Sequence, residues 1–216
     1  MFLDTASIRN SVVSRAKHLG YTPQSVRGSK AYVDLTITPN DTPATIVIEK
    51  DTQFSSSVNG ISYLFATSNS VTLNVNANGV YTTANVELNQ GIPLTHRYTA
   101  NTKNPDQKFV LPNANTDTST LTVQIQTSAE DSTTFTYAIA NDTTTIGATS
   151  NVYFLEEAED GKFECIFGDD VIGRKPVTGN IVLLSSLIAD ADNPNGATTF
   201  IPVSYTHLTL PTTPYV

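Results

Sequence analysis

The sequence predicts a mainly β fold (α+β), in which an N-terminal helix precedes antiparallel, β-sandwich-like sheets with several hairpins. Most of the 216-residue chain consists of short runs that alternate apolar and polar residues, which is the period of a half-buried strand. Three Asx-Gly pairs stand between such runs and predict tight hairpin turns: Asn59-Gly60, Asn78-Gly79 and Asp160-Gly161. The uncharged polar residues are rich in Thr, Ser and Asn, which favours strands and turns.

The chain opens with a predicted helix at about Thr5–Leu19, within a helical segment that covers residues 1–28. Asp4 is a candidate N-cap, and Gly20 fits the position just after the last turn. Apolar residues recur at helical spacing and form one stripe: Ile8, Val12, Val13, Ala16 and Leu19. The sequence offers this helix no helical partner, so we expect the stripe to be an interaction face that packs on the β-region or on another chain.

Residues 29–102 are predicted to form a first β-subdomain. Alternation predicts strands at about 31–38, 46–49, 54–58, 61–65, 71–77 and 80–88. Two-residue turns would place Phe54 opposite Phe65 in the first hairpin. In the second hairpin they would place the even-numbered residues from Val80 to Leu88 on one face with Val71, Leu73, Val75 and Ala77. We expect a boundary near residues 98–106, because the stretch 100–106 has no apolar pattern.

Residues 103–203 are predicted to form a second β-subdomain that contains a glycine-rich loop. Its expected strands are 109–111, 121–126, 135–139, 151–155, 163–167, 181–188 and 199–203. Counting from the Asp160-Gly161 turn puts Phe154, Ala158, Phe163, Cys165 and Phe167 on one face, where Glu156 also falls and fits poorly. Cys165 is the only cysteine, so the chain has no internal disulfide, and its alternation predicts a buried structural thiol.

A loop punctuated by glycine follows the last of these hairpins. Its candidate site residues form a signature loop: Phe167, Gly168, Asp169, Asp170, Gly173, Pro176 and Gly179. Such spacing of glycine and proline predicts a shaped, rigid loop that leads into the strand 181–188.

These residues carry a resemblance. The signature loop, continued by Asn180-Ile181 and by the stretch 192–196 (Asp-Asn-Pro-Asn-Gly), resembles the signature stretch of phage baseplate wedge proteins of T4-like contractile tails, the baseplate J-like family. Residues 2–23 are similar to a helix-and-loop segment of that wedge subunit, and residues 52–54 with 63–65 resemble the family's first hairpin. The resemblance thus covers the chain from Phe2 to about Val203.

The resemblance implies a structural, non-enzymatic component of the virion, located in the tail baseplate and assembled in the host cytoplasm. Its partners would be other baseplate wedge subunits and copies of itself, and it would need no cofactor. The resemblance also implies a chain truncated at both ends, with a further helical region before Phe2 and a C-terminal part beyond Val203. Residues 204–216 do not continue the resemblance and look like translated adapter sequence, so we expect a non-native tail.

Composition and motifs argue against several other functions. The net charge of −8 argues against a nucleic-acid partner, which would favour a Lys/Arg face. No run approaches the ~18 apolar residues of a transmembrane helix, so no membrane partner is expected. None of the common hydrolase, dinucleotide or phosphate-loop motifs occurs, and the three histidines, His18, His96 and His207, form no visible cluster. We therefore expect no enzyme activity.

No metal site is expected either. The spacing of Asp190, Asp192 and Gly196 is similar to that of a calcium loop, but the glycine comes one residue late and Ile201 stands where the bidentate Glu is needed. A turn of Asn, Pro and Gly before the last strand is the better interpretation. A cation held jointly by Asp169, Asp170 and this turn stays an alternative.

Two classes of function therefore remain from the sequence. The first is the structural baseplate subunit. The second is a ligand-binding β-module, such as a carbohydrate-binding or adhesin domain, although Trp is absent and most Tyr and Phe residues fall into the predicted core. A tail lysozyme is a weaker third, because no convergent pair of acids can be named.

Overall fold

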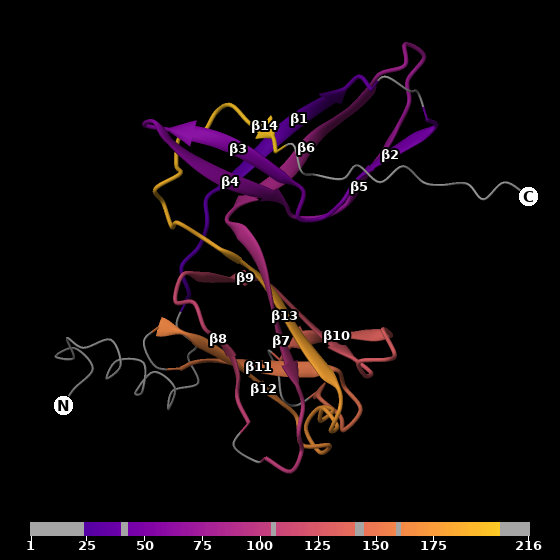
Figure 1. Cartoon of the computed structure of the whole chain (residues 1–216), viewed down its shortest axis with the longest axis vertical. Helices are drawn as coiled ribbons and strands as arrows, with labels where there is room; N and C mark the ends of the chain where they lie inside the picture. Colours follow the sequence, from indigo (N-terminus) through magenta and orange to yellow (C-terminus); the bar gives the residue numbers. More distant parts are fainter. Residues whose placement is uncertain (1–23, 40–42, 105–106, 141–144, 159–160, 204–216) are drawn as a thin grey trace, which may run out of the picture. The chain divides into compact units, whose positions relative to one another are not determined.

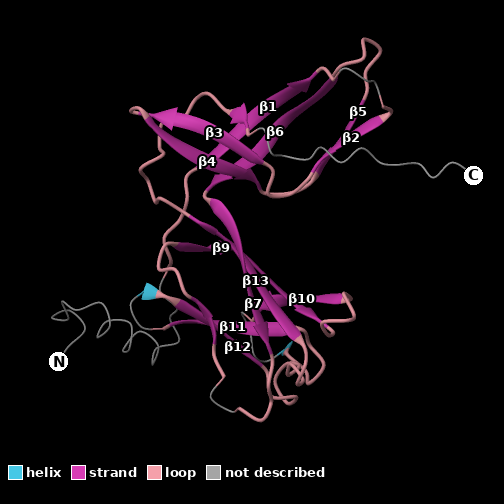
Figure 2. Cartoon of the chain, in the orientation of Figure 1, coloured by secondary structure: helices cyan, strands magenta, loops and turns pink. Residues whose placement is uncertain are grey.

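The computed structural model describes residues 24–39, 43–104, 107–140, 145–158 and 161–203. This part of the chain is built from strands joined by turns and loops (Figure 2). The predicted mainly β fold is confirmed, with both antiparallel and mixed sheets. The predicted helix Thr5–Leu19 and the tail 204–216 lie outside the described residues.

The described chain forms two compact units. Among the described residues, the host unit takes 27–93 and 189–203, and the inserted unit takes 94–188 together with 24–26. The chain therefore leaves the host unit after Pro93 and returns to it at Ala189. The predicted subdomains 29–102 and 103–203 follow chain order, whereas these units do not.

The host unit contains a five-stranded and a two-stranded sheet (Figure 1). The larger sheet is antiparallel, in the order β1 (Lys30–Ile37), β6 (Tyr81–Gln90), β4 (Ile61–Thr67), β3 (Gln53–Val58) and β14 (Ile201–Pro202). The smaller one pairs β2 (Thr45–Ile48) with β5 (Val71–Asn74). Two buried clusters hold the unit, one around Phe54, Phe65 and Leu88 and one around Ile46 and Tyr81.

The inserted unit contains one seven-stranded mixed sheet. Its order is β7 (Ile92–Thr99), β13 (Ile181–Ile188), β9 (Thr116–Gln126), β10 (Thr134–Ile139), β11 (Val152–Glu157), β12 (Phe163–Phe167) and β8 (Phe109–Leu111). β10 and β11 pair in parallel, and both also pair antiparallel with their other neighbours.

This sheet curls around a single core to which all seven strands contribute. Its two edge strands meet through Tyr98 of β7, whose hydroxyl donates to the Val110 carbonyl oxygen of β8 at 2.6 Å. The Tyr98 ring also contacts the Phe109 ring edge to face, with centroids 5.9 Å apart. The curled sheet fixes the ends of the loop that joins β12 to β13.

The hairpin of β3 and β4 has the predicted register. Val58 lies opposite Ile61, and Phe54 lies opposite Phe65. Both turn residues have positive φ, 51° at Asn59 and 80° at Gly60, as a two-residue type I′ turn requires.

The predicted register of the β11–β12 hairpin is wrong by one residue. Phe167 pairs with Tyr153 rather than with Phe154, and Cys165 pairs with Leu155. The Ala158 amide donates to the Lys162 carbonyl oxygen at 2.7 Å, so three residues, not two, separate the strands. A shift of one residue turns every side chain of β11 to the other face. Tyr153 and Glu157 are therefore buried, whereas Phe154 and Glu156 lie on the outward face.

The predicted hairpin around Asn78-Gly79 is also corrected. Gly79 has φ 74°, but Asn78 does not have positive φ, and the Asn76 amide pairs with the Val80 carbonyl oxygen. This too leaves a loop of three residues. Beyond one bridge, between Val75 and Tyr81, the strands diverge: β5 pairs with β2 and β6 pairs with β1 and β4.

The predicted single face of β6 is broken by a bulge. Asn85 has φ 57°, and its amide donates to the Asp34 carboxylate at 3.0 Å. The bulge changes the phase of the strand, so Tyr81 is buried before it and Val86 and Leu88 are buried after it.

Candidate functional site

The signature loop leaves β12 and enters β13, and both strands anchor it in the core. Phe163 and Cys165 of β12 are buried, as are Val182 and Leu184 of β13. The Gly179 amide donates to the Ala100 carbonyl oxygen at 3.0 Å, which ties the end of the loop to the residues after β7.

Two acidic side chains shape the first half of the loop. The Asp169 carboxylate accepts hydrogen bonds from the Ile172 amide at 2.9 Å and the Val171 amide at 3.0 Å, and these bonds hold the pKa of Asp169 below its ordinary value. The Asp170 carboxylate accepts from the Lys175 amide at 2.9 Å, and the Asp170 amide donates to the Gly173 carbonyl oxygen. Both carboxylates therefore cap backbone amides, as Asx turns do.

Glycine is required where the loop folds back on itself. A Cβ at position 168 would overlap the backbone of Gly173, and Gly173 has φ +85°. A Cβ at position 173 would also lie 2.8 Å from a methyl group of Val152. The loop is further held by hydrogen bonds from the Gly173 amide to the Gly147 carbonyl oxygen and from the Arg174 amide to that of Ser150.

The remaining signature residues pack inward. The Phe167 ring contacts the rings of Phe109 and Tyr137 edge to face, with centroids 5.2 and 5.6 Å apart. Pro176 is buried. The Arg174 guanidinium lies 6.0 Å from the centroid of the Phe135 ring, over its face.

The outer surface of this loop exposes three aliphatic side chains that the sequence-based site did not include. The exposed fractions are 70% for Val171, 43% for Ile172 and 59% for Val177. The sequence feature that could have indicated them is the presence of branched apolar residues in a loop otherwise rich in Gly, Asp and Pro. We name Val171, Ile172 and Val177 the aliphatic tip.

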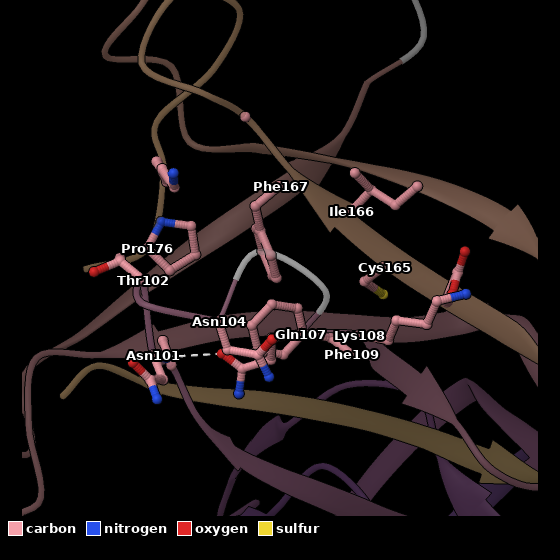
Figure 3. A pocket seen from close by; sticks show the side chains of 14 residues that line it. Asn101, Thr102, Asn104, Gln107, Lys108, Phe109, Cys165, Ile166, Phe167 and Pro176 are labelled. Carbon is pink, nitrogen blue, oxygen red and sulfur yellow. Dashed lines mark hydrogen bonds and ion pairs between the residues drawn. The ribbon is translucent and has the colours of Figure 1, made fainter. Parts of the chain in front are cut away.

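A pocket of about 450 Å³ lies beside the loop, between β12 and residues 100–104 and 107–109 (Figure 3). Its apolar lining residues are Ala100, Phe109, Cys165, Ile166, Phe167 and Pro176. Its polar lining residues are Asn101, Thr102, Asn104, Gln107, Lys108, Glu164 and Lys175. Figure 3 shows Phe167 directed toward Phe109, with the amide side chains of Asn101, Asn104 and Gln107 grouped at one side.

One charge pair and one bridging amide organise the polar lining. The Lys108 ammonium lies 3.3 Å from Oε2 of Glu164. The Gln107 side chain bridges two backbone groups, because its oxygen accepts from the Asn101 amide at 2.7 Å and its nitrogen donates to the Thr99 carbonyl oxygen at 2.7 Å.

Cys165 lines the pocket as the buried thiol that its alternation predicts. Its exposed fraction is 2%, and burial, with a smaller contribution from the Glu164 charge, raises the pKa of the thiol to about 12. A nucleophilic cysteine needs the opposite shift. The geometry therefore fits a structural role.

Several other predicted positions do not join this site. The helix-face residues Ile8, Val12, Val13, Ala16 and Leu19 lie outside the described residues, as do His18 and His207. His96 lies on β7. The stretch 190–196 belongs to the host unit and forms the predicted turn, in which the Asn195 amide donates to the Asp192 carbonyl oxygen and Gly196 has φ +94°.

Within the described ranges, no three His, Cys, Asp or Glu side chains gather as a metal ion would require. The part of the chain described here contains no helix long and apolar enough to cross a bilayer.

The site thus combines a rigid loop that carries exposed aliphatic side chains with a partly polar pocket, both on a curled β-sheet. No protein-family model matches the sequence, and no curated protein matches it.

Proposed function

We propose that this chain is a structural component of a bacteriophage contractile-tail baseplate wedge. It binds other wedge subunits and copies of itself through the aliphatic tip of the signature loop. The observation that carries the proposal is a loop held by internal hydrogen bonds that nevertheless exposes Val171, Ile172 and Val177. The choice of a baseplate wedge as the assembly rests on the resemblance of the surrounding residues to the baseplate J-like family.

The energetics of the aliphatic tip favour a protein partner. Burying a fully exposed Val or Ile side chain gains about 1.5–3 kcal/mol, and Val171, Ile172 and Val177 would gain the part of it that corresponds to their exposed fractions. Part of such a gain is normally offset by the conformational entropy that a loop loses when binding orders it. A loop that its own hydrogen bonds already hold in shape loses less of this entropy. Three such exposed side chains on a loop that hydrogen bonds hold in shape therefore favour contact with a neighbouring subunit.

The proposal assigns no catalysis, cofactor, nucleic acid or membrane to the chain, and it locates the chain in the virion. It is supported by the use of both loop carboxylates as backbone caps and by the raised thiol pKa of Cys165. We further propose that the predicted helix Thr5–Leu19 contributes a second contact through its apolar stripe, and that the sheets pack in a sandwich-like manner in the assembled subunit.

Complementation tests the proposal. In a phage that encodes this protein, Val171→Asp with Val177→Asp should block tail assembly, because two carboxylates would be buried at the subunit contact. Ile61→Asp is the matched control, since Ile61 is 58% exposed in the host unit. The proposal predicts loss of infectious particles for the double variant alone. Infectious titres equal to wild type for that variant would refute the role of the aliphatic tip.

A further inference from the structure

Three Asn-Gly pairs occur in the sequence, and the structure gives each a different environment: Asn59-Gly60, Asn78-Gly79 and Asn195-Gly196. Such a pair can modify itself, because the backbone nitrogen of the glycine can attack the side-chain carbonyl carbon of the asparagine. Glycine has no side chain to hinder the approach. The reaction needs a glycine amide that is not hydrogen-bonded and a backbone that lets the side chain reach it. These two requirements separate the three pairs.

At Asn78-Gly79 the attacking nitrogen is occupied. The Gly79 amide donates to the Asn76 carbonyl oxygen at 3.1 Å, and the Asn78 amide donates to the Asn76 side-chain oxygen at 2.9 Å. Attack would first have to break the bond of the Gly79 amide, which adds to the barrier. The structure therefore protects this pair.

At Asn59-Gly60 the turn holds the reacting atoms apart. Positive φ at both residues gives a type I′ turn, in which ψ of the first residue is about +30°. This ψ places the Gly60 nitrogen on the side of the Asn59 Cα away from its Cβ, and thus far from the side-chain carbonyl. Val58 pairs with Ile61 and closes the turn, so rotation into the reactive form would open the end of the hairpin. This pair is also protected.

Asn195-Gly196 meets both requirements better than the other two pairs. Both residues are exposed, and the Gly196 amide donates no hydrogen bond within the described part of the chain. A Cβ built at Gly196 would meet no atom within 4 Å, so a ring has room to form there. The Ala197 amide donates to the Pro194 carbonyl oxygen at 3.2 Å and closes the turn, which no strand adjoins directly.

The Ser29 hydroxyl adds a third feature at this pair. It donates to the Asn195 side-chain oxygen at 2.7 Å and has a longer contact of 3.4 Å with the Ala191 carbonyl oxygen. A donor on the amide oxygen stabilises the negative charge that this oxygen gains during attack. The Ser29 carbonyl oxygen accepts from the Gln90 amide at 2.8 Å, which holds the serine in place.

We propose that Asn195 is a self-modification site, which loses its side-chain amide with assistance from Ser29. The Gly196 nitrogen gives its proton to hydroxide and forms a bond to Cγ of Asn195. The bond from Cγ to the side-chain nitrogen then breaks, this nitrogen takes a proton from water, and it leaves as ammonia. A five-membered succinimide ring remains. Water opens the ring at either carbonyl and gives aspartate or isoaspartate at position 195.

The products would weaken the end of the host unit. Isoaspartate adds a CH₂ group to the backbone, and both products add a negative charge to a turn that already contains Asp190 and Asp192. The turn leads to Phe200, whose ring contacts the Phe65 ring edge to face with centroids 5.0 Å apart, and to β14. We expect the modified protein to melt at a lower temperature. This inference does not rest on the baseplate assignment.

Incubation of the purified chain in mildly alkaline buffer tests the inference. Peptide mass spectrometry follows amide loss at the three pairs, and enzymatic methylation detects isoaspartate. In the folded protein we expect Asn195 to react about 5-fold or more faster than Asn59 and Asn78, where a hydrogen bond or a turn must open first. In urea the three pairs should react at similar rates. Folded protein in which Asn195 reacts no faster than the other two would overturn the inference.

Two variants of Ser29 test its assistance. Ser29→Ala should slow amide loss at Asn195 about 5-fold, and Ser29→Thr, which keeps the hydroxyl, should react at the wild-type rate. The rates at Asn59 and Asn78 are the internal control and should not change. Melting temperatures show whether the variants are folded. An unchanged or faster reaction at Asn195 in folded Ser29→Ala would overturn the proposed assistance and the site as stated.

Discussion

Gly168 and Gly173 are the residues on which the shape of the signature loop depends. Their spacing in the sequence predicted a rigid loop, and the structure explains it by the close approach of the two backbones. The exposed positions of Val171 and Val177 could not be predicted in the same way, because apolar residues in a loop are as easily buried as exposed. Which side of the loop faces outward depends on the bonds to Asp169 and Asp170.

Gly168→Ala should destabilise the inserted unit. The added methyl group would overlap the Gly173 backbone, which cannot move without breaking the bond from the Asp170 amide. We expect a loss of about 1–3 kcal/mol in the free energy of unfolding, as for other overpacked sites. Gly147→Ala is the control, because a Cβ there has no neighbour within 4 Å. Chemical denaturation measures both, and equal stabilities would contradict the proposed close approach.

Cys165 should resist alkylation in the folded protein. The thiolate is the reactive form, and raising the pKa from 9.0 to about 12 lowers its fraction at pH 8. We expect iodoacetamide to modify the native protein at least about 100-fold more slowly than the urea-unfolded chain, from the thiolate fraction alone. Mass spectrometry over time gives both rates. Rapid modification of the native protein would mean that the thiol is accessible and ionised.

At the scale of elements, Asx-Gly pairs located all three turns but gave the register of only one. In Asn59-Gly60 both residues have positive φ, so the two-residue turn holds. Around Gly79 and Gly161 only three-residue loops fit the hydrogen bonds, and the glycine supplies a residue with positive φ. The two loop lengths have the same Asx-Gly sequence, so local pattern cannot separate them. Glu156, which fitted the predicted inner face poorly, was the one sign of the error.

Two single substitutions distinguish the registers of β11 and β12. Leu155→Cys should form a disulfide with Cys165, because these residues are opposite each other in a pair without backbone hydrogen bonds. Such pairs have Cα atoms about 4.5 Å apart, within the range that a disulfide spans. Glu156→Cys should not cross-link, since it lies on the outward face opposite Glu164. Free-thiol counts after oxidative refolding give the answer, and the reverse pattern would restore the register predicted from the sequence.

At the scale of the whole molecule, sequence patterns predicted the strands better than their partners. The strand β7 was missed, although the alternation of Leu94, His96 and Tyr98 was visible. The parallel pairing of β10 with β11 and the return of the chain to the host unit at Ala189 are long-range contacts. Neither the parallel pairing nor the return of the chain produces a periodic pattern of apolar residues from which it could be predicted. The baseplate function was predicted only from the resemblance to the baseplate J-like family. That resemblance indicated the assembly but not the aliphatic tip, the surface proposed to bind other subunits.

The central claim is that this chain is a structural part of a contractile-tail baseplate, and its presence in that structure can be measured directly. Immunogold labelling of purified tails, with an antibody raised against the chain, locates it by electron microscopy. The account predicts gold at the baseplate end of each tail and the chain's peptides in the same particles by mass spectrometry. Tails that lack the chain, or label confined to the sheath or the head, would contradict it.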